Sequence, residues 1–258
     1  MPEGDTIHHA ANRIRAVLEG RVPEEIRTPQ PRHGFDGWPA ALAGKAVRSV
    51  DAHGKHLFMR FEGDVTLHSH LRMTGSWGVY PEGARWRRAA RRAWIVLRYE
   101  GWEVVEFDGP VLELMSDRRT RSHPQLAALG QDVLGGSFDQ GLFLRALRSD
   151  DQTRPIGDAL LNQQTIAGIG NLWKAETCFA LGVDPWRPLA AVGDEEALAL
   201  VGFARTAMAE SVRSGYKHRP REVYRQAGRP CPRCGRRILQ RGQGENNRLT
   251  FWCPGCQV

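Results

Sequence analysis

Two pairs of cysteines near the C-terminus have the spacing of a metal site. Cys231 and Cys234 form one C-x-x-C pair, Cys253 and Cys256 form the second, and eighteen residues separate the pairs. Four thiolates around a hairpin-length insert are typical of a tetrahedral structural zinc site. A pair of redox motifs is the alternative, but two copies at this separation favour zinc. We therefore predict one structural Zn²⁺ ion, which would supply folding free energy on the order of 10 kcal/mol to this short segment.

The start of the chain offers a nucleophile beside an acid. Pro2 follows the initiator Met1, and methionine is readily removed before a small residue, which would leave a secondary amine at Pro2. An α-amino group titrates at about pH 8, so a useful fraction is neutral near neutral pH. Attack of this amine on a sugar C1′ would give an iminium ion that stays cationic, and Glu3 could transfer a proton there. A flexible acidic tail is the alternative interpretation.

A glycine-rich turn between two helical stretches is a possible anion site. Gly168 and Gly170 bracket Ile169 and permit a tight turn with exposed backbone N–H groups. The following helix begins near Asn171, whose side chain could cap it or donate to a phosphate. A purely structural turn between helices would use the same glycines.

The charge distribution points to a polyanionic partner. The chain has 36 Lys and Arg, 29 Asp and Glu and a net charge of +7. Residues 205–248 contain twelve cations and three acids, and residues 85–92 contain five arginines without an acid. The planar guanidinium fork suits phosphate oxygens, which favours a nucleic acid. Solvated faces of a protein from an arginine-favouring genome are the alternative.

Composition excludes several classes of protein. Hydrophobic residues make up 41% of the 258 residues and charged residues 25%, so the chain can bury a core. No segment approaches the roughly 20 apolar residues of a membrane span. The first twenty residues carry charges throughout and do not resemble a secretory signal. Four of the five cysteines lie in the last 28 residues, which argues against a secreted disulfide scaffold. We expect a cytoplasmic protein without a membrane partner.

The periodicity of apolar residues predicts a β region between helical regions. Apolar residues at helical spacing predict a helix over residues 5–19, ended by Gly20. Alternating runs then predict seven short strands, which indicates an antiparallel sandwich or barrel. These runs are residues 46–52, 56–61, 65–71, 77–80, 93–99, 103–107 and 111–115. Helical patterns return after Gly130, over residues 143–149, 156–164, 171–182 and 194–215.

Taken together, the motifs resemble the formamidopyrimidine-DNA glycosylase / endonuclease VIII family over nearly the whole chain. Each motif alone is weakly specific, but their common order is highly specific. The matching segments are Pro2-Glu3-Gly4-Asp5-Thr6, Gly54-Lys55-His56-Leu57, residues 70–76, residues 160–163, residues 167–171 with Glu176, and Arg248 ahead of Cys253-Pro254-Gly255-Cys256-Gln257.

The resemblance implies an α+β fold with three parts. These would be an N-terminal β-sandwich catalytic domain with a leading helix over residues 1–130, a helix–two-turn–helix DNA-binding domain over 131–225, and a zinc-finger hairpin over 226–258. It also implies a bifunctional DNA glycosylase and AP lyase of base excision repair. The partner would be damaged double-stranded DNA, bound in the cleft between the two halves by a monomer.

Catalytic roles follow from the same resemblance. Pro2 would be the nucleophile that forms the Schiff base, and Glu3 the acid acting at the deoxyribose ring. Lys55 would contact the phosphate next to the lesion and assist β-elimination. Arg248 would grip phosphate from the tip of the finger and take part in δ-elimination.

Further DNA contacts are expected from both halves. Asn171 would hold the backbone, and Met73 would fill the space left by the extruded base, as an apolar wedge can. Arg118 and Arg119, with Arg121, are candidates for the other void-filling or opposite-base contacts. Arg154 is a candidate for an additional phosphate contact.

The motifs give mixed indications of the substrate. The opening PEGDT resembles the endonuclease VIII branch, which prefers oxidised pyrimidines, and Gly157 fits that branch as well. Residues 70–76 instead resemble the branch that removes 8-oxoguanine and formamidopyrimidines. We expect oxidised pyrimidines. The alternatives are the second substrate class, or a non-catalytic zinc-containing protein that binds damaged DNA.

Overall fold

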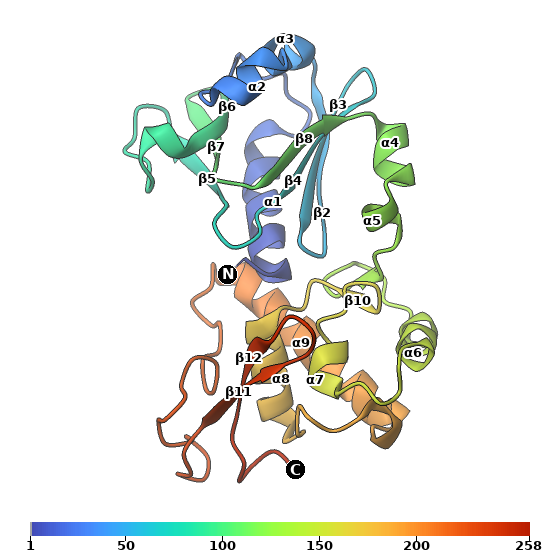
Figure 1. Ribbon diagram of the computed structural model, residues 1–258. Helices are drawn as coiled ribbons and strands as arrows, with labels where there is room; N and C mark the ends of the chain where they lie inside the picture. Colours follow the sequence, from blue (N-terminus) through green and yellow to red (C-terminus); the bar gives the residue numbers. More distant parts are fainter. Residues whose placement is uncertain (1) are drawn as a thin grey trace. The chain divides into compact units, whose positions relative to one another are not determined.

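The computed structural model describes residues 2–258 as two compact units, one ending at Ala127 and the other beginning at Ala128 (Figure 1). Met1, whose removal is predicted above, lies outside the described residues. Within this range, every helix is too short or too polar to cross a lipid bilayer. The predicted α+β fold is confirmed, with a β-rich first unit and a helical second unit that carries the cysteine pairs.

The first unit contains two antiparallel four-stranded sheets, ordered β2-β3-β4-β8 and β1-β6-β7-β5. One apolar core contains side chains from both sheets, as in a sandwich. The strands are β1 (Glu25–Arg27), β2 (Val47–His53), β3 (His56–Phe61), β4 (Val65–His70), β5 (Ser76–Pro81), β6 (Ala93–Tyr99), β7 (Trp102–Phe107) and β8 (Val111–Met115). The seven predicted strands are present. Strand β1 was not predicted, because three residues are too few to show an alternating pattern.

Helix α1 (Gly4–Leu18) closes one side of this core. Its apolar stripe buries Ile7, Ala11, Ile14 and Leu18 at helical spacing against the sheets. The helix ends where the chain turns at Gly20, which has a positive φ of 76°. The shorter helical segments of this unit are α2 (Pro31–Phe35), α3 (Trp38–Leu42), η1 (Ala90–Arg92), α4 (Asp117–Ser122) and α5 (Pro124–Ala127).

The second unit is built around the buried helix α8 (Asn171–Leu181). Its other elements are β9 (Gln131–Asp132), α6 (Gln140–Ser149), α7 (Ile156–Ala159), β10 (Ile166–Ala167), η2 (Leu189–Ala191), α9 (Asp194–Arg213), β11 (Leu239–Gln243) and β12 (Arg248–Trp252). Trp173 and Cys178 are fully buried in the apolar core. The carboxylate of Glu176 accepts backbone N–H bonds from Val223 and Tyr224 at 3.1 and 2.8 Å, which anchors the segment after α9.

The helix predicted over residues 156–164 is wrong beyond residue 159. Side-chain amides compete with the helix there. Asn162 Oδ1 accepts the N–H of Gln164 at 3.0 Å, and the Gln163 side chain bonds to the N–H of Gly168 and the C=O of Ile169 at 3.0 and 3.1 Å. These contacts convert the segment into two successive turns that lead to α8.

Candidate functional site

The N-terminal residues are fixed at the head of α1. Pro2 is half-buried, and Glu3, the N-cap residue of α1, is fully buried. The Glu3 N–H donates to Thr6 Oγ1 at 3.3 Å, so the start of the helix determines where Glu3 lies. The predicted nucleophile and acid are therefore held beside each other by a regular element. An ordered, buried carboxyl group does not fit the alternative of a flexible tail.

Lys55 lies at the tip of the β2–β3 hairpin. The loop consists of Gly54 and Lys55, flanked by the paired residues His53 and His56. Gly54 has a φ of 57°, which matches two-residue loops that place glycine first. The half-buried Lys55 is thus presented by a short loop between two paired strands.

A cluster of histidines, which the sequence did not predict, underlies this hairpin. His56 Nδ1 and His68 Nε2 are 2.9 Å apart, and the His56 and His70 rings meet edge-on at 4.6 Å. Burial, followed by the charge of His70, lowers the pKa of His56 to about 2. Burial, followed by the charges of Arg72 and Lys55, lowers the pKa of His70 to about 4. These rings are therefore neutral at neutral pH.

Met73 projects from the loop between β4 and β5 with 64% of its surface exposed. The loop is fixed at its base, because Thr74 Oγ1 donates to Asp108 O at 3.1 Å. A Cβ at Gly75 would approach Leu71 O to 2.8 Å and Gly109 Cα to 2.9 Å, so only glycine fits there. Met73 is therefore an exposed, flexible, apolar side chain on a firmly held backbone. These properties suit a side chain that fills the space left by an extruded base.

Beneath this loop lies Glu106, a second feature that the sequence did not reveal. Its side chain is fully buried, and neither oxygen has a well-formed hydrogen bond within residues 2–258. Burial raises its pKa to about 8, although the nearby Gly109 N–H partly offsets this effect. A Cβ at Gly109 would lie 1.5 Å from Glu106 Oε1, so the turn packs directly on the carboxyl group.

The candidate arginines that follow β8 lie on a short helix. Arg118, Arg119 and Arg121 are exposed on α4, which is capped by Ser116 Oγ accepting the N–H of Arg119 at 3.1 Å. Their proposed contacts with DNA remain predictions.

In the second unit, Arg154 and Arg248 line one cavity of about 550 Å³. Arg154 is paired with Asp150 at 3.0 Å. Arg248 begins β12, is exposed, and has no ion pair within the described part of the chain. The structure therefore brings together two residues that the sequence separates by more than ninety positions.

Asn171 is tied to the same strand. Its side-chain Nδ2 donates to Leu249 O at 2.8 Å, next to Arg248, and its buried Oδ1 has no hydrogen-bond partner within residues 2–258. One turn further along α8, the buried Lys174 Nζ donates to Thr250 Oγ1 at 2.5 Å and Gln243 Oε1 at 3.3 Å. The start of α8 and the β11–β12 hairpin thus form one hydrogen-bonded assembly, with Arg248 at its edge.

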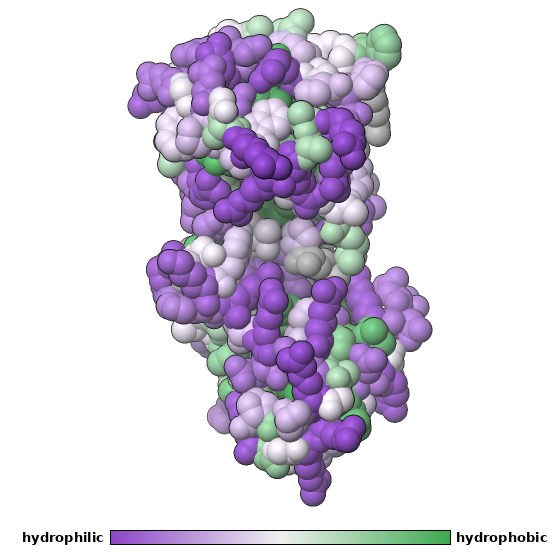
Figure 2. All heavy atoms as spheres, turned by 90° about the vertical axis from the view of Figure 1, so that its left-hand side faces the viewer, coloured by the Kyte–Doolittle hydropathy of each residue, from purple (hydrophilic) through white to green (hydrophobic). Residues whose placement is uncertain are grey.

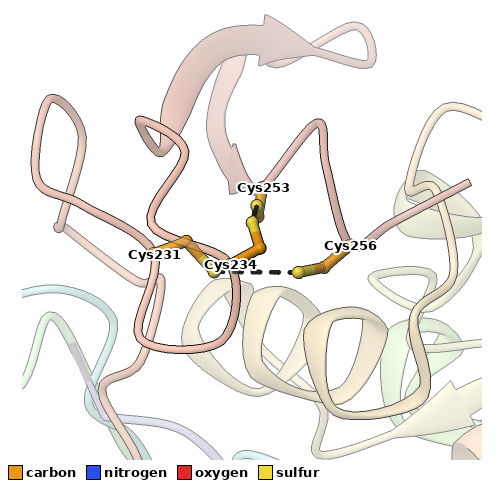
Figure 3. A group of neighbouring side chains, drawn as sticks. All are labelled: Cys231, Cys234, Cys253 and Cys256. Carbon is orange, nitrogen blue, oxygen red and sulfur yellow. Dashed lines mark hydrogen bonds between the residues drawn. The ribbon is translucent and has the colours of Figure 1, made fainter.

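The four cysteines converge as expected for one metal ion (Figure 3). Their sulfur atoms all lie within 4.8 Å of one another. A tetrahedral ion with sulfur ligands at about 2.3 Å requires sulfur atoms roughly 3.8 Å apart. The Cys231–Cys256 and Cys234–Cys253 sulfur distances are 3.8 and 3.4 Å, so the group fits a metal ion. The hydrogen bond with Cys234 is the main cause that raises the pKa of the Cys256 thiol to about 12.

Comparison with known proteins covers both units. Residues 1–120 match the family model of the formamidopyrimidine-DNA glycosylase N-terminal domain, and residues 129–219 match that of the formamidopyrimidine-DNA glycosylase H2TH domain. The chain is 39% identical to the probable endonuclease 8 2 of Streptomyces coelicolor, covering 100% of this chain and 94% of that protein. It is 35% identical to the DNA-(apurinic or apyrimidinic site) lyase Nei2 of Mycolicibacterium smegmatis, with coverage of 100% and 99%.

Solved structures share the fold. A complex of the Lactococcus lactis Fpg with DNA that contains an abasic site matches with a TM-score of 0.82 and 22% identity, over 99% of each chain. MutM in complex with DNA containing carbocyclic 8-oxo-G matches with a TM-score of 0.81 and 23% identity, over 100% of each chain.

Proposed function

This chain belongs to the formamidopyrimidine-DNA glycosylase family of DNA repair enzymes, and from that membership we propose that it excises oxidised pyrimidines and cleaves the strand. The supporting observation is the ordered Pro2-Glu3 pair at the head of α1. The enzyme is a DNA glycosylase and AP lyase of base excision repair, as the names of its relatives indicate. It would act as a monomer on damaged double-stranded DNA, in the cytoplasm and associated with the nucleoid.

The Pro2 amine would attack C1′ of the damaged nucleotide. The base leaves with the electron pair of the glycosidic bond and takes up a proton. Glu3 then gives a proton to the ring oxygen as the C1′–O4′ bond opens, which leaves an iminium ion between Pro2 and C1′. This cation makes C2′ acidic, and loss of a C2′ proton expels the 3′ phosphate in β-elimination. Lys55 would bind the phosphate beside the lesion and assist this step.

Phosphate contacts and a wedge would present the nucleotide. Flipping a base out of the stack costs a few kcal/mol, and the exposed Met73 would occupy the space that it leaves. Arg248, Asn171 and Arg154 would hold the backbone from the second unit without reading sequence. Arg248 would also assist δ-elimination, which releases the 5′ phosphate. Arg118 and Arg119 would reach the opposite strand.

Cys231, Cys234, Cys253 and Cys256 would hold a structural Zn²⁺ ion. When bound, the ion supplies charge neutralisation for four thiolates and holds the two C-x-x-C turns together. Through Asn171 and Lys174, the hairpin then keeps Arg248 at the edge of its cavity.

The packing of Gly157 supports the pyrimidine substrate class. A Cβ at this position would lie 2.9 Å from Gln243 Oε1, Pro185 Cβ and Pro185 O, so a long side chain does not fit. Members of the 8-oxoguanine branch tend to carry a lysine there, as the family resemblance indicates. Rates on matched duplexes with thymine glycol or 8-oxoguanine test this assignment, and faster excision of 8-oxoguanine would reverse it.

Borohydride trapping on an abasic-site duplex tests the mechanism. Borohydride reduces the iminium ion, so the unmodified protein should form a covalent adduct, and Pro2→Gly or a chain with an N-terminal extension should not trap equally well. Lys55→Ala is the matched control: it removes a different amine and should still trap, because the Schiff base precedes β-elimination. An adduct that survives the change at Pro2 but not at Lys55 would identify Lys55 as the nucleophile. Selective binding of damaged DNA without trapping or strand cleavage would favour the non-catalytic alternative.

A further inference from the structure

One strongly basic surface has no part in the mechanism above. It is the arginine loop, residues 83–92 between β5 and β6, which lies at the left of the N-terminal unit in Figure 1. Figure 2 faces this side and shows hydrophilic side chains gathered over that unit. The loop carries five arginines and no acid: Arg85, Arg87, Arg88, Arg91 and Arg92.

The backbone of the arginine loop is held in place. Trp86 Nε1 donates to Glu103 Oε2 at 2.8 Å, and the Trp86 ring packs edge-on against Phe107 at 5.6 Å. The Gln30 side chain donates to Arg91 O at 2.7 Å. A loop fixed in this way presents its side chains without the full entropy cost of ordering a flexible segment.

Much of the charge on this loop is not neutralised. Arg88 and Arg92 share one carboxylate, that of Asp108, at 2.9 and 2.6 Å. Arg85, Arg87 and Arg91 are exposed, and none of them has an ion pair within the described residues. Three guanidinium groups are therefore available to an anion from solution.

The loop also borders an open hollow of about 870 Å³, lined by Arg27, residues 83–90 and Glu103. Glu103 has both oxygens engaged, one with Arg27 at 3.0 Å and the other with Trp86. Arg27 also contacts Glu25 at 3.5 Å, so the excess positive charge beside the hollow comes from the arginines of the loop itself. Hollows of this volume accept groups the size of a nucleotide.

We propose that the arginine loop is a second DNA-contact surface, which binds the phosphate backbone of the duplex away from the lesion, because Trp86 bonds Glu103 at the end of β7 that is remote from the Met73 loop. Arginine forks bind phosphate oxygens in pairs without reading sequence. The only aromatic ring of the loop, Trp86, is occupied by Glu103 and Phe107, so the loop lacks the stacking platform typical of single-strand binding. The identity of the partner as DNA rests on the proposed function.

The experiment compares wild type with the triple variant Arg85→Ala, Arg87→Ala, Arg91→Ala. Kd is measured against salt for two duplexes with a central abasic analogue, about 12 and 36 base pairs long, roughly one and three helical turns. On the long duplex, the slope of log K against log salt should fall by about 2 to 3, since each lost phosphate contact removes about 0.9. Affinity there should drop at least about tenfold at moderate salt. On the short duplex, affinity and strand cleavage should be unchanged.

The matched control replaces the same three arginines by lysine, which keeps the charge and should keep most of the salt slope. Thermal unfolding of all three proteins shows whether the exposed changes leave the fold intact.

Equal slopes for the wild type and the alanine variant on the long duplex would refute the proposal. Equal losses on both duplexes would place the loop at the lesion and also contradict it. Unchanged DNA binding with lost binding of polyglutamate would indicate an acidic protein as the partner. In one further outcome, the wild type fails to trap abasic DNA while its salt slope on the long duplex still exceeds that of the alanine variant. That result would contradict the proposed function but support the arginine loop as a DNA-contact surface.

Discussion

Replacing Glu106 by glutamine should remove a pH-dependent loss of stability from the N-terminal unit. The Glu106 side chain is fully buried against the turn at Gly109, which in turn holds the Met73 loop through Thr74 and Asp108. Glutamine has nearly the same shape as a protonated glutamate and cannot ionise. The variant therefore changes charge with little change in packing.

The size of the effect follows from the raised pKa. Burial lifts the pKa of Glu106 from 4.5 to about 8, so the folded protein binds this proton more tightly than the unfolded chain. The contribution of protonated Glu106 to the free energy of unfolding is therefore fully present below pH 4.5. It is lost as the pH rises toward and through 8. At about 1.4 kcal/mol per pKa unit, the wild type should lose about 4 kcal/mol relative to Glu106→Gln between roughly pH 5 and 8.5.

Urea unfolding of both proteins across this pH range measures the difference directly. Titrations elsewhere in the chain are common to both proteins, so the difference between the two free energies of unfolding isolates position 106. The curve for Glu106→Gln should be flatter, and the two curves should converge at acidic pH. Parallel curves over the whole range would show that the carboxyl group is ionised in the folded protein at neutral pH, and our account of this turn would be wrong.

Four further outcomes are expected. Met73→Ala should slow excision of a paired lesion by about tenfold and leave cleavage at abasic sites unchanged. Its thermal stability should also be unchanged, because the Met73 side chain is mostly exposed; a loss of stability would instead assign Met73 to the core. Cys253→Ser should reduce bound zinc, measured by elemental analysis, and lower the unfolding temperature; unchanged metal content would refute the zinc site. Gly157→Lys should destabilise the second unit by about 2 kcal/mol or more in urea unfolding, since its Cβ meets Pro185. Lys174→Met should weaken DNA binding without changing the Schiff-base chemistry, measured as Kd against single-turnover trapping, and equal effects on both would contradict a positioning role.

The sequence predicted the elements whose pattern is repeated over many residues. Helix α1 and the seven longer strands of the first unit followed from apolar periodicity, although β7 buries five successive residues and therefore both of its faces. The cysteine cluster followed from spacing alone. The helix over 156–164 was overestimated because the amide of Gln163 bonds the following turn, a competition that apolar periodicity does not record.

The features missed within the site have a common physical cause. Glu106 appears at the end of a strand as an ordinary polar residue, and only the fold shows that the turn at Gly109 covers it. The sequence also did not reveal that Asn171 Nδ2 donates to Leu249 O, on a strand 78 residues away. Burial of a polar group and its distant partners depend on tertiary packing, so local sequence patterns do not reveal them.

The bonds from Asn171 and Lys174 to strand β12 determine which part of the second unit would respond to loss of the metal ion. Because these bonds join the helix to the hairpin, loosening of the hairpin would also break contacts at the start of α8. Stripping the ion would register as faster amide exchange at the beginning of α8, far along the chain from any cysteine ligand. Loss of a bound ion would therefore affect Arg248, at the edge of the same hairpin, while the N-terminal unit keeps its own separate core.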